Sequence, residues 1–211
     1  MNIGKNSSYS NRHRKAGVTL VELMIGMGIS AIVIGGTLSL FLMGSKISAN
    51  GTGRLLINRD IRNFTNEMVE NARYADYFKT YTSYMDRDEQ NDGGSGDFLV
   101  LVHRDPADPD KISRIVGYYR YTVTEGTEGP VLMFDNTYSP SSSSSMIDLL
   151  PPTSDHGTHS EVIELSNGLS DGKLFYNFYD RSIVVRGEIL HDGAFADQVT
   201  NTYNFTISPR G

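Results

Sequence analysis

The sequence predicts an α+β protein in which a long N-terminal helix packs on a mainly antiparallel β head. Three observations lead to this fold class. Residues 18–43 form an apolar run that contains a single charged side chain. Residues 54–75 place apolar side chains three or four positions apart, and the chain after residue 78 alternates short β-prone runs with turn residues. The 211 residues are enough for one small domain besides the helix.

Residues 18–43 are predicted to be a transmembrane helix. At a rise of about 1.5 Å per residue, a helix of that length measures roughly 39 Å, whereas the hydrocarbon core of a bilayer is about 30 Å thick. The preceding residues 1–17 contain no acidic side chain, and their basic residues are Lys5, Arg12, Arg14 and Lys15. The positive-inside rule therefore predicts a single-pass protein of the inner (cytoplasmic) membrane, with a cytoplasmic N-terminus and the head outside the cytoplasm.

A cleaved secretory signal peptide is the alternative explanation of this run. Such peptides have apolar cores of about 7–15 residues and are cut after the core at a small-residue site. The sequence Ala49-Asn50-Gly51 is a weak site of that kind. However, the apolar run is longer than such a core, and the sharper small-residue junction, at Gly17, precedes it. Cutting at that junction leaves the helix on the mature chain.

Glu22 is the single charged residue within 18–43. A carboxylate in the apolar part of a membrane helix costs roughly 3 kcal/mol on insertion scales, and such charges usually have a functional partner. The simpler interpretation is that Glu22 lies near the cytoplasmic interface and that its side chain reaches water. The sequence favours a functional role because one acid stands alone at the start of a long apolar run.

Residues 15–24, Lys-Ala-Gly-Val-Thr-Leu-Val-Glu-Leu-Met, closely resemble the class III signal of type IV prepilins and type II secretion pseudopilins. The resemblance implies that a prepilin peptidase cuts between Gly17 and Val18 and that the new amine of Val18 is methylated. It also implies that Glu22 assists the docking of subunits, by pairing with the free amine of Val18 on a neighbour. The family usually has Phe where this chain has Val18.

The chain is expected to contain four segments: a leader (1–17), the transmembrane half of the helix (18–43), an amphipathic continuation of the helix (44–79) and a β-rich head (80–211). Polar side chains fill the outer face of the continuation. Its inner, apolar stripe consists of Ile57, Ile61, Phe64, Met68, Ala72 and Ala75.

The head is predicted to contain some seven strands. They are residues 98–102, 112–123, 131–134, 161–165, 173–179, 182–190 and 200–207. Two segments, 80–97 and 137–160, are expected to be exposed loops because they are rich in Ser, Gly, Asp and Pro. Long loops in compact domains are often functional. We therefore interpret both as subunit-contact or adhesive surfaces.

Metal binding by these loops has little support. Asp88 and Asp92 begin a partial calcium loop that lacks the acid at its twelfth position, where Leu99 stands. A second group of oxygen ligands is Asp105, Asp108 and Asp110. Solvated turn acids are the better interpretation of all five, and calcium stays a weak candidate. Zinc at Asp155, His156 and His159 is disfavoured, because a flexible polar loop rarely preorganises such a site. No cofactor is expected.

Composition disfavours several other functions. The net charge is −6, and without the four basic residues of 1–17 the chain has 15 basic and 25 acidic residues, which makes nucleic acid an unlikely partner. The absence of Cys excludes disulfides and thiol catalysis. No Gly-x-Ser-x-Gly motif and no glycine-rich phosphate loop is found, so we expect no enzymatic activity.

The sequence thus predicts a structural subunit of a type IV pilus-like or type II secretion pseudopilus filament. The resemblance implies its partners, which are a prepilin peptidase, other pilin-like subunits, and the assembly platform protein and ATPase of the same system. In the family that the chain resembles, major pilins commonly have a Pro in this helix, whereas residues 18–43 contain none. The head is also larger than that of a minimal major pseudopilin, so the resemblance favours a minor subunit. Two alternatives remain. One is a single-span membrane-anchored extracytoplasmic binding protein that forms no filament, and the other is a secreted domain cut near Gly51.

Overall fold

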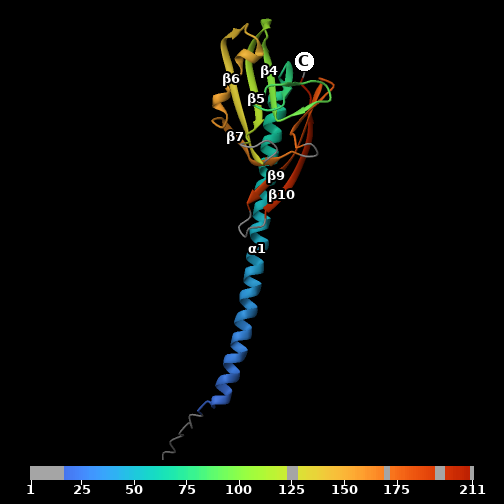
Figure 1. The fold of residues 1–211 in the computed structure, drawn as a ribbon. Helices are drawn as coiled ribbons and strands as arrows, with labels where there is room; N and C mark the ends of the chain where they lie inside the picture. Colours follow the sequence, from blue (N-terminus) through green and yellow to red (C-terminus); the bar gives the residue numbers. More distant parts are fainter. Residues whose placement is uncertain (1–16, 123–127, 169–171, 193–197, 210–211) are drawn as a thin grey trace, which may run out of the picture. The chain divides into compact units, whose positions relative to one another are not determined.

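Figure 1 shows the computed structural model of the chain, which describes residues 17–122, 128–168, 172–192 and 198–209. The α+β class is confirmed, because helix α1 (Leu20–Arg73) is followed by an antiparallel sheet. The chain divides into two compact units, Met1–Ser45 and Lys46–Gly211. The first unit therefore contains the N-terminal part of α1, and the second contains the C-terminal part of α1 and the sheet. The leader 1–17, apart from Gly17, lies outside the described residues.

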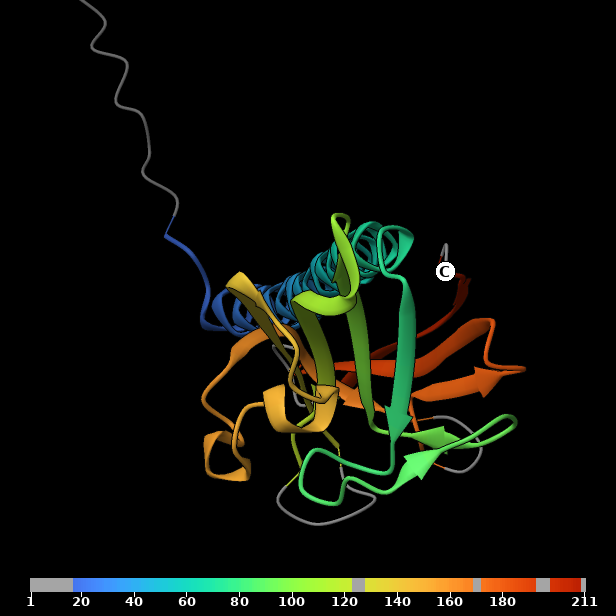
Figure 2. The ribbon, with the colours of Figure 1, turned by 90° about the horizontal axis from the view of Figure 1, so that it is seen from above.

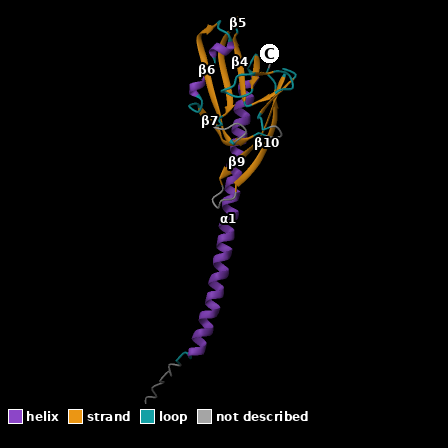
Figure 3. Cartoon of the chain, in the orientation of Figure 1, coloured by secondary structure: helices purple, strands orange, loops and turns teal. Residues whose placement is uncertain are grey.

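The described residues form a ten-stranded sheet (Figure 3). Its order is β2-β1-β4-β5-β6-β7-β9-β8-β3, and β10 also pairs with β9. Each strand pair is antiparallel. The strands are β1 (Tyr77–Tyr81), β2 (Glu89–Gln90), β3 (Ser95–Gly96), β4 (Phe98–Asp105), β5 (Asp108–Arg120), β6 (Gly129–Ser142), β7 (Ser160–Asn167), β8 (Phe175–Phe178), β9 (Ser182–Asp192) and β10 (Gln198–Ile207). Two short helices, α2 (Met146–Leu149) and η1 (Thr153–Asp155), lie between β6 and β7.

The C-terminal part of α1 packs on one face of the sheet through its apolar stripe, and Figure 2 shows the strands curving around one side of the helix. Ile57, Phe64 and Met68 are at most 1% exposed, whereas Ile61 is partly buried. The ring of Phe64 makes edge contacts with Tyr118 of β5 at 6.1 Å. It makes similar contacts with Tyr203 and Phe205 of β10, at 5.8 and 5.9 Å. Full burial of such side chains contributes about 1.5–3 kcal/mol each. This part of α1 therefore organises the core of the head.

A second core covers the opposite face of β4, β5 and β6. Leu99 and Leu101 of β4 face α1, and the alternate residues Phe98, Val100 and Val102 face the second core. All five are fully buried. Successive side chains of a strand point to opposite faces, so a strand covered on both faces needs a continuous apolar run. This is why residues 98–102 lack the alternation of a half-exposed strand.

The cover of the second core comes from the two segments that the sequence predicted to be exposed loops. Tyr84 of segment 80–97 is 1% exposed and Leu150 of segment 137–160 is 6% exposed, and both belong to this core. The Tyr84 hydroxyl also donates to the Pro152 carbonyl at 3.0 Å, which joins the two segments. The prediction of exposed loops was therefore wrong for these parts. The apolar outer face of the sheet has to be covered, and residues of both segments cover part of it.

The amphipathic helix ends at Arg73, before the boundary predicted at residue 79. The Ala75 N–H bonds to the Ala72 carbonyl, and the Asp76 N–H already bonds to the Val102 carbonyl of β4, at 2.8 Å. The chain then continues as β1, in register with β4. The helical spacing of Ala72 and Ala75 suggested a longer helix, but long-range pairing with β4 gives residues 77–81 a strand.

Seven of the observed strands, β4 to β10, correspond to the seven predicted ones, although residue 123 of the second predicted strand lies outside the described residues. The strands β1, β2 and β3 were missed. β2 and β3 have two residues each. Strands this short form through pairing with β1 and β8 and have no sequence period of their own.

Replacing Phe64 with Ala is expected to lower the free energy of unfolding of the head by about 3–5 kcal/mol, since a large cavity opens between α1 and the sheet. Leu55→Ala is the matched control on the same helix, because Leu55 is 72% exposed. We expect it to change the free energy by about 0.5 kcal/mol or less. Urea unfolding of the detergent-solubilised full chain, followed by circular dichroism, measures both. Equal losses in the two variants would contradict this packing.

Candidate functional site

The first unit exposes apolar side chains all around α1. Leu20, Ile32 and Phe41 are 73%, 76% and 71% exposed. The most apolar window of α1 has a mean hydropathy of 2.0, and none of it is buried. Water makes such a surface unstable, whereas lipid solvates it. By length and composition, α1 is able to cross a membrane.

Two hydroxyl groups within this unit bond to the backbone of the helix itself. Ser30 Oγ donates to the Gly26 carbonyl at 2.7 Å. Thr37 Oγ1 lies within hydrogen-bond distance of the Val33 and Ile34 carbonyls, at 3.0 and 2.9 Å. Such bonds allow Ser and Thr to lie in hydrocarbon without an unsatisfied donor. Glu22 is therefore the side chain of 18–43 that most needs a partner.

Glu22 forms a capping box with Thr19 at the start of α1. Its Oε2 accepts hydrogen bonds from the Thr19 N–H and the Thr19 Oγ1, both at 2.9 Å. In return, the Glu22 N–H donates to Thr19 Oγ1 at 3.2 Å. This reciprocal pairing satisfies orphan donors of the first turn and suits the positive end of the helix dipole. The Thr-x-x-Glu spacing before an apolar run is a signal for this cap, and the sequence analysis missed it.

One face of the helix is hollowed next to Glu22. A shallow groove there is lined by Val18, Glu22, Leu23, Gly26, Met27, Ser30, Ala31 and Ile34. Four-residue spacing along α1 places several of these residues on one face, namely Glu22, Gly26, Ser30 and Ile34. Val18, four residues before Glu22, precedes the helix and lines the same groove. A Cβ atom on Gly26 would meet nothing within 4 Å. Small residues of this kind let a second helix approach closely in lipid.

The predicted cleavage site lies just outside the helix. Gly17, Val18 and Thr19 have no regular secondary structure and are exposed. A peptide bond is cut most readily where the chain is exposed and not hydrogen-bonded within a helix. The bond between Gly17 and Val18 meets this requirement, and Val18 lines the same groove as Glu22.

In the head, a cluster of buried charges joins the end of β5 to the residues that immediately precede β4 and β8. Arg120 Nη2 donates to Asp97 Oδ2 at 2.7 Å and to the Gly172 carbonyl at 2.5 Å. Lys173 Nζ lies 3.4 Å from the same carboxylate, and the Leu174 N–H donates to its other oxygen. The side chains of Asp97 and Arg120 are 8% and 1% exposed. Burial raises the pKa of Asp97, although both cations oppose the shift. The sequence analysis missed this cluster, because its members are far apart in the chain.

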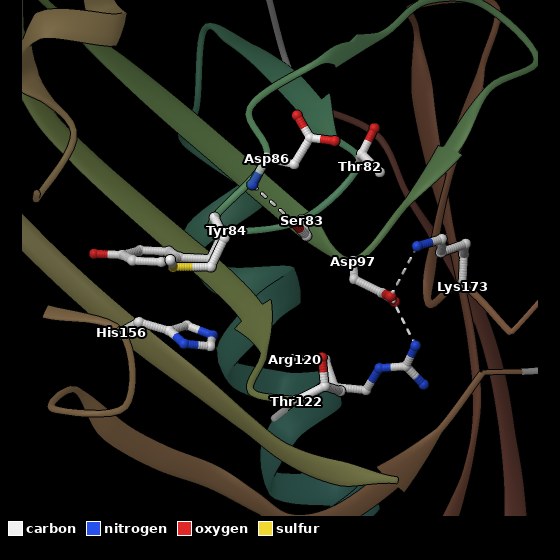
Figure 4. A pocket seen from close by; sticks show the side chains of 10 residues that line it. Thr82, Ser83, Tyr84, Asp86, Asp97, Arg120, Thr122, His156 and Lys173 are labelled. Carbon is white, nitrogen blue, oxygen red and sulfur yellow. Dashed lines mark hydrogen bonds and ion pairs between the residues drawn. The ribbon is translucent and has the colours of Figure 1, made fainter. Parts of the chain in front are cut away.

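Figure 4 shows a polar hollow beside this cluster, with a volume of about 180 Å³. Asp97, Arg120 and Lys173 line one side, and Tyr84 and His156 line another. The rings of Tyr84 and His156 are stacked, with centroids 5.5 Å apart. The hollow has room for a small polar molecule, but its groups suggest no particular reaction.

His156 and His159 pack on the tyrosines of the second core. The rings of Tyr84 and Tyr119 stack at 4.2 Å, and His159 Nδ1 lies 2.8 Å from the Tyr119 hydroxyl. Burial lowers the pKa of both histidines, the charge of His159 lowers that of His156 further, and Asp155 acts in the opposite direction on His159. The structure thus uses these histidines as aromatic packing groups.

The five acidic residues considered for calcium lie in turns and at strand ends. Asp92 Oδ1 accepts the Tyr179 N–H at 2.5 Å, and Asp105 accepts bonds from the Ala107 N–H and the Ser141 hydroxyl. Asp108 pairs with Lys111 at 2.9 Å and accepts the Asp110 N–H. The Asp88 backbone carbonyl accepts the Thr82 N–H. In the part of the chain that the structure describes, no group of three or more acidic, His or Cys side chains is arranged to hold a metal ion.

Comparison with known proteins gives one match. Residues 12–38 match the family model of the prokaryotic N-terminal methylation motif, and this range includes Gly17, Val18 and Glu22. The match confirms the resemblance to prepilins. It supports a type IV pilin-like protein that a prepilin peptidase processes and that a single apolar helix anchors in a membrane. No match was found among curated proteins or among solved structures.

The stability of the head is expected to fall as the pH drops below about 6.5, the ordinary pKa of His. Burial lowers the pKa of His103, His156 and His159, so the unfolded chain takes up their protons first. The stabilisation is complete above the ordinary pKa and is lost as the pH falls through it toward the lowered values. Urea unfolding at pH 7.5 and 5.5 measures this loss.

The double variant His156→Gln/His159→Gln is expected to lose less stability between these two pH values than the parent chain. Both chains share Asp97, whose raised pKa acts with the opposite sign at lower pH, so the difference between them isolates the two histidines. An equal loss in both chains would refute the role assigned to this pair.

Proposed function

We propose that this prepilin-like chain is a minor subunit of a type IV pilus-like or type II secretion pseudopilus filament. The observation that carries the proposal is the position of Glu22. One carboxylate lies at the start of an apolar helix, on the same face as the small residues Gly26 and Ser30. Close packing of helices from neighbouring subunits needs small residues on the contact face and a partner for any charge that becomes enclosed.

Processing supplies that partner. In the proposed sequence of events, a prepilin peptidase cuts between Gly17 and Val18, and the new amine of Val18 is methylated. A secondary amine of this kind still carries a positive charge at neutral pH. The amine of one subunit then pairs with Glu22 of a neighbour and fixes the axial register of the two helices. The exposure of 17–19 and the place of Val18 in the groove support this order.

The energetics favour pairing between subunits only after cleavage. Before assembly, the Glu22 carboxylate is held by the Thr19 N–H and hydroxyl. A hydrogen-bonded carboxylate without a cation remains costly in lipid, at roughly 3 kcal/mol. A charged amine offsets this cost better than neutral donors do, because it also attracts the carboxylate by Coulomb interaction, which is strong where the dielectric constant is low. An uncleaved chain has no free amine at Val18, because the nitrogen of Val18 is then part of the peptide bond to Gly17.

The remaining parts of the proposal follow from the resemblance and the composition. The subunit awaits assembly in the inner membrane, with its N-terminus in the cytoplasm and its head in the periplasm or at the cell surface. An assembly ATPase and a platform protein drive its extraction, and other pilin-like subunits are its direct neighbours. The missing Pro in 18–43 and the large head favour a minor subunit over a major one. The proposal includes no enzymatic activity and no nucleic acid partner.

A membrane-anchored binding protein that forms no filament is the second candidate. The polar hollow beside Asp97 and Arg120 favours it, because it has room for a small polar ligand. Such a protein does not need a charged Glu22. The two candidates are therefore separated by variants at this position.

Glu22→Ala and Glu22→Gln are both expected to be processed normally and to be absent from filaments. Glutamine retains the capping box with Thr19, since Gln serves at this position of the motif, but it removes the charge. If Glu22 only caps its own helix, the Glu22→Gln chain is still incorporated into filaments, whereas the Glu22→Ala chain is not. Ser30→Ala is a control on the same face. Immunoblots of sheared filaments and of membranes measure incorporation and processing, and normal incorporation of both Glu22 variants would contradict the proposal.

A further inference from the structure

The whole outer edge of strand β10 has no strand partner among the described residues. Among the described residues, β2 pairs with β1 alone, β3 with β8 alone and β10 with β9 alone. β2 and β3 have two residues each, whereas β10 has ten. Figure 2 shows β10, in dark red, at one border of the head. An outer strand presents a row of backbone N–H and C=O groups that can pair with another strand.

The residues of β10 do not protect this edge. Soluble proteins usually guard a border strand with charges, Pro or a bulge. Residues 198–207 contain no charged residue and no Pro. Their register with β9 runs from Gln198 to Ile207 without a shift. Within the described chain, residues 198–207 form no backbone hydrogen bond beyond this ladder. By contrast, an ion pair between Lys79 and Glu89 lies at the β1–β2 border.

The two faces beside this edge differ in polarity. Thr202, Asn204 and Thr206 are exposed on one face. On the other face, Tyr203 and Ile207 are buried and Phe205 is partly buried against α1. A hollow of about 250 Å³ also lies where the end of β10 meets α1, and it is lined by Val69, Ala72, Arg73, Thr206, Ile207 and Ser208. A strand added here extends an apolar face on one side and an uncharged polar face on the other.

We propose that the outer edge of β10 binds an extended segment of a different protein chain by β-strand addition. The segment alternates apolar and uncharged polar residues, and its apolar side chains continue the row of Tyr203, Phe205 and Ile207. Backbone hydrogen bonds supply affinity, and the two faces supply specificity.

A second copy of this chain fits less well than a different protein. The other open edges of the described sheet fit β10 poorly. β2 and β3 have two residues each. The parts of β6 and β7 that lack a partner on one side contain charged residues or Pro, namely Asp135, Pro140 and Glu161. Two copies therefore pair along this edge best symmetrically, β10 to β10, and such a contact closes a dimer. A filament needs a contact that does not close, so the choice of a different chain rests on the proposed function.

The test places a photo-cross-linking amino acid at Thr202 or at Thr206 of the full chain in its native membranes and filaments. Strand addition predicts cross-links from both positions to one segment of one other protein, at sites about four residues apart, because the two strands run side by side at the same rise. The control position is Glu188 of β9, the cross-strand neighbour of Thr202. It lies one strand further from the edge, about 5 Å, so its cross-link is expected to be lost or much weaker.

Three results would overturn the proposal: cross-links only between two copies, cross-links from Thr202 and Thr206 to unrelated segments, or no cross-link above that from Glu188. The same samples show whether the chain is in filaments, so the two proposals fail separately. A paired-site result on a chain confined to membranes overturns the filament function and supports the edge contact. A chain that is found in filaments but gives no paired cross-link sites supports the filament function and overturns the edge contact.

A second measurement checks the edge without a cross-linker. The variant Thr202→Lys/Asn204→Lys adds two charges next to the edge at exposed positions, so we expect the head to stay folded by circular dichroism. Hydrogen exchange of 200–207 is then expected to be slower in the assembled parent chain than in the purified parent chain. The variant is expected to lose this slowing, and equal exchange of the parent in both states would count against the edge contact.

Discussion

The structure depends on one constraint, which is that a single helix has to satisfy two different surroundings. Residues 20–43 carry apolar side chains on every side, and none of their most apolar window is buried within the protein. Residues 46–73 carry one apolar stripe that the sheet covers. A lipid environment stabilises the first part, and a folded head stabilises the second. The core between α1 and the sheet follows from the need to bury that stripe.

Glu22 lies where this constraint is most severe, and the capping box changes how its role is understood. The carboxylate has hydrogen-bond donors within its own chain, from Thr19. Pairing with an amine on a neighbour would therefore exchange these bonds for a charged one. Such an exchange makes docking selective for cleaved subunits, because an uncleaved chain offers only an amide at Val18. The same residue thus serves the start of the helix in the free subunit and, in our proposal, the contact in the filament.

Much of this account was predictable from local sequence. The apolar run, the stripe containing Phe64 and Met68, and the strands β4 to β10 each have a local pattern or composition that one segment reveals alone. Most of the missed features depend on distant partners. β1 replaces the predicted end of the helix because β4 captures residues 77–81. Tyr84 becomes a core residue because the outer face of β4 to β6 is apolar. The pairing of Asp97 with Arg120 joins residues separated by 23 positions. The Thr19–Glu22 cap was different, because its signal was local and was overlooked.

The N-terminal mass of the membrane-bound protein is the most direct test of the central claim, that this chain is processed as a prepilin. It is measured in cells with and without their prepilin peptidase. The account predicts a mature chain that starts at Val18 and carries one added methyl group when the peptidase is present, and a chain that retains residues 1–17 when it is absent. A chain that begins at Met1 in both strains, or one that begins near Thr52, would contradict it.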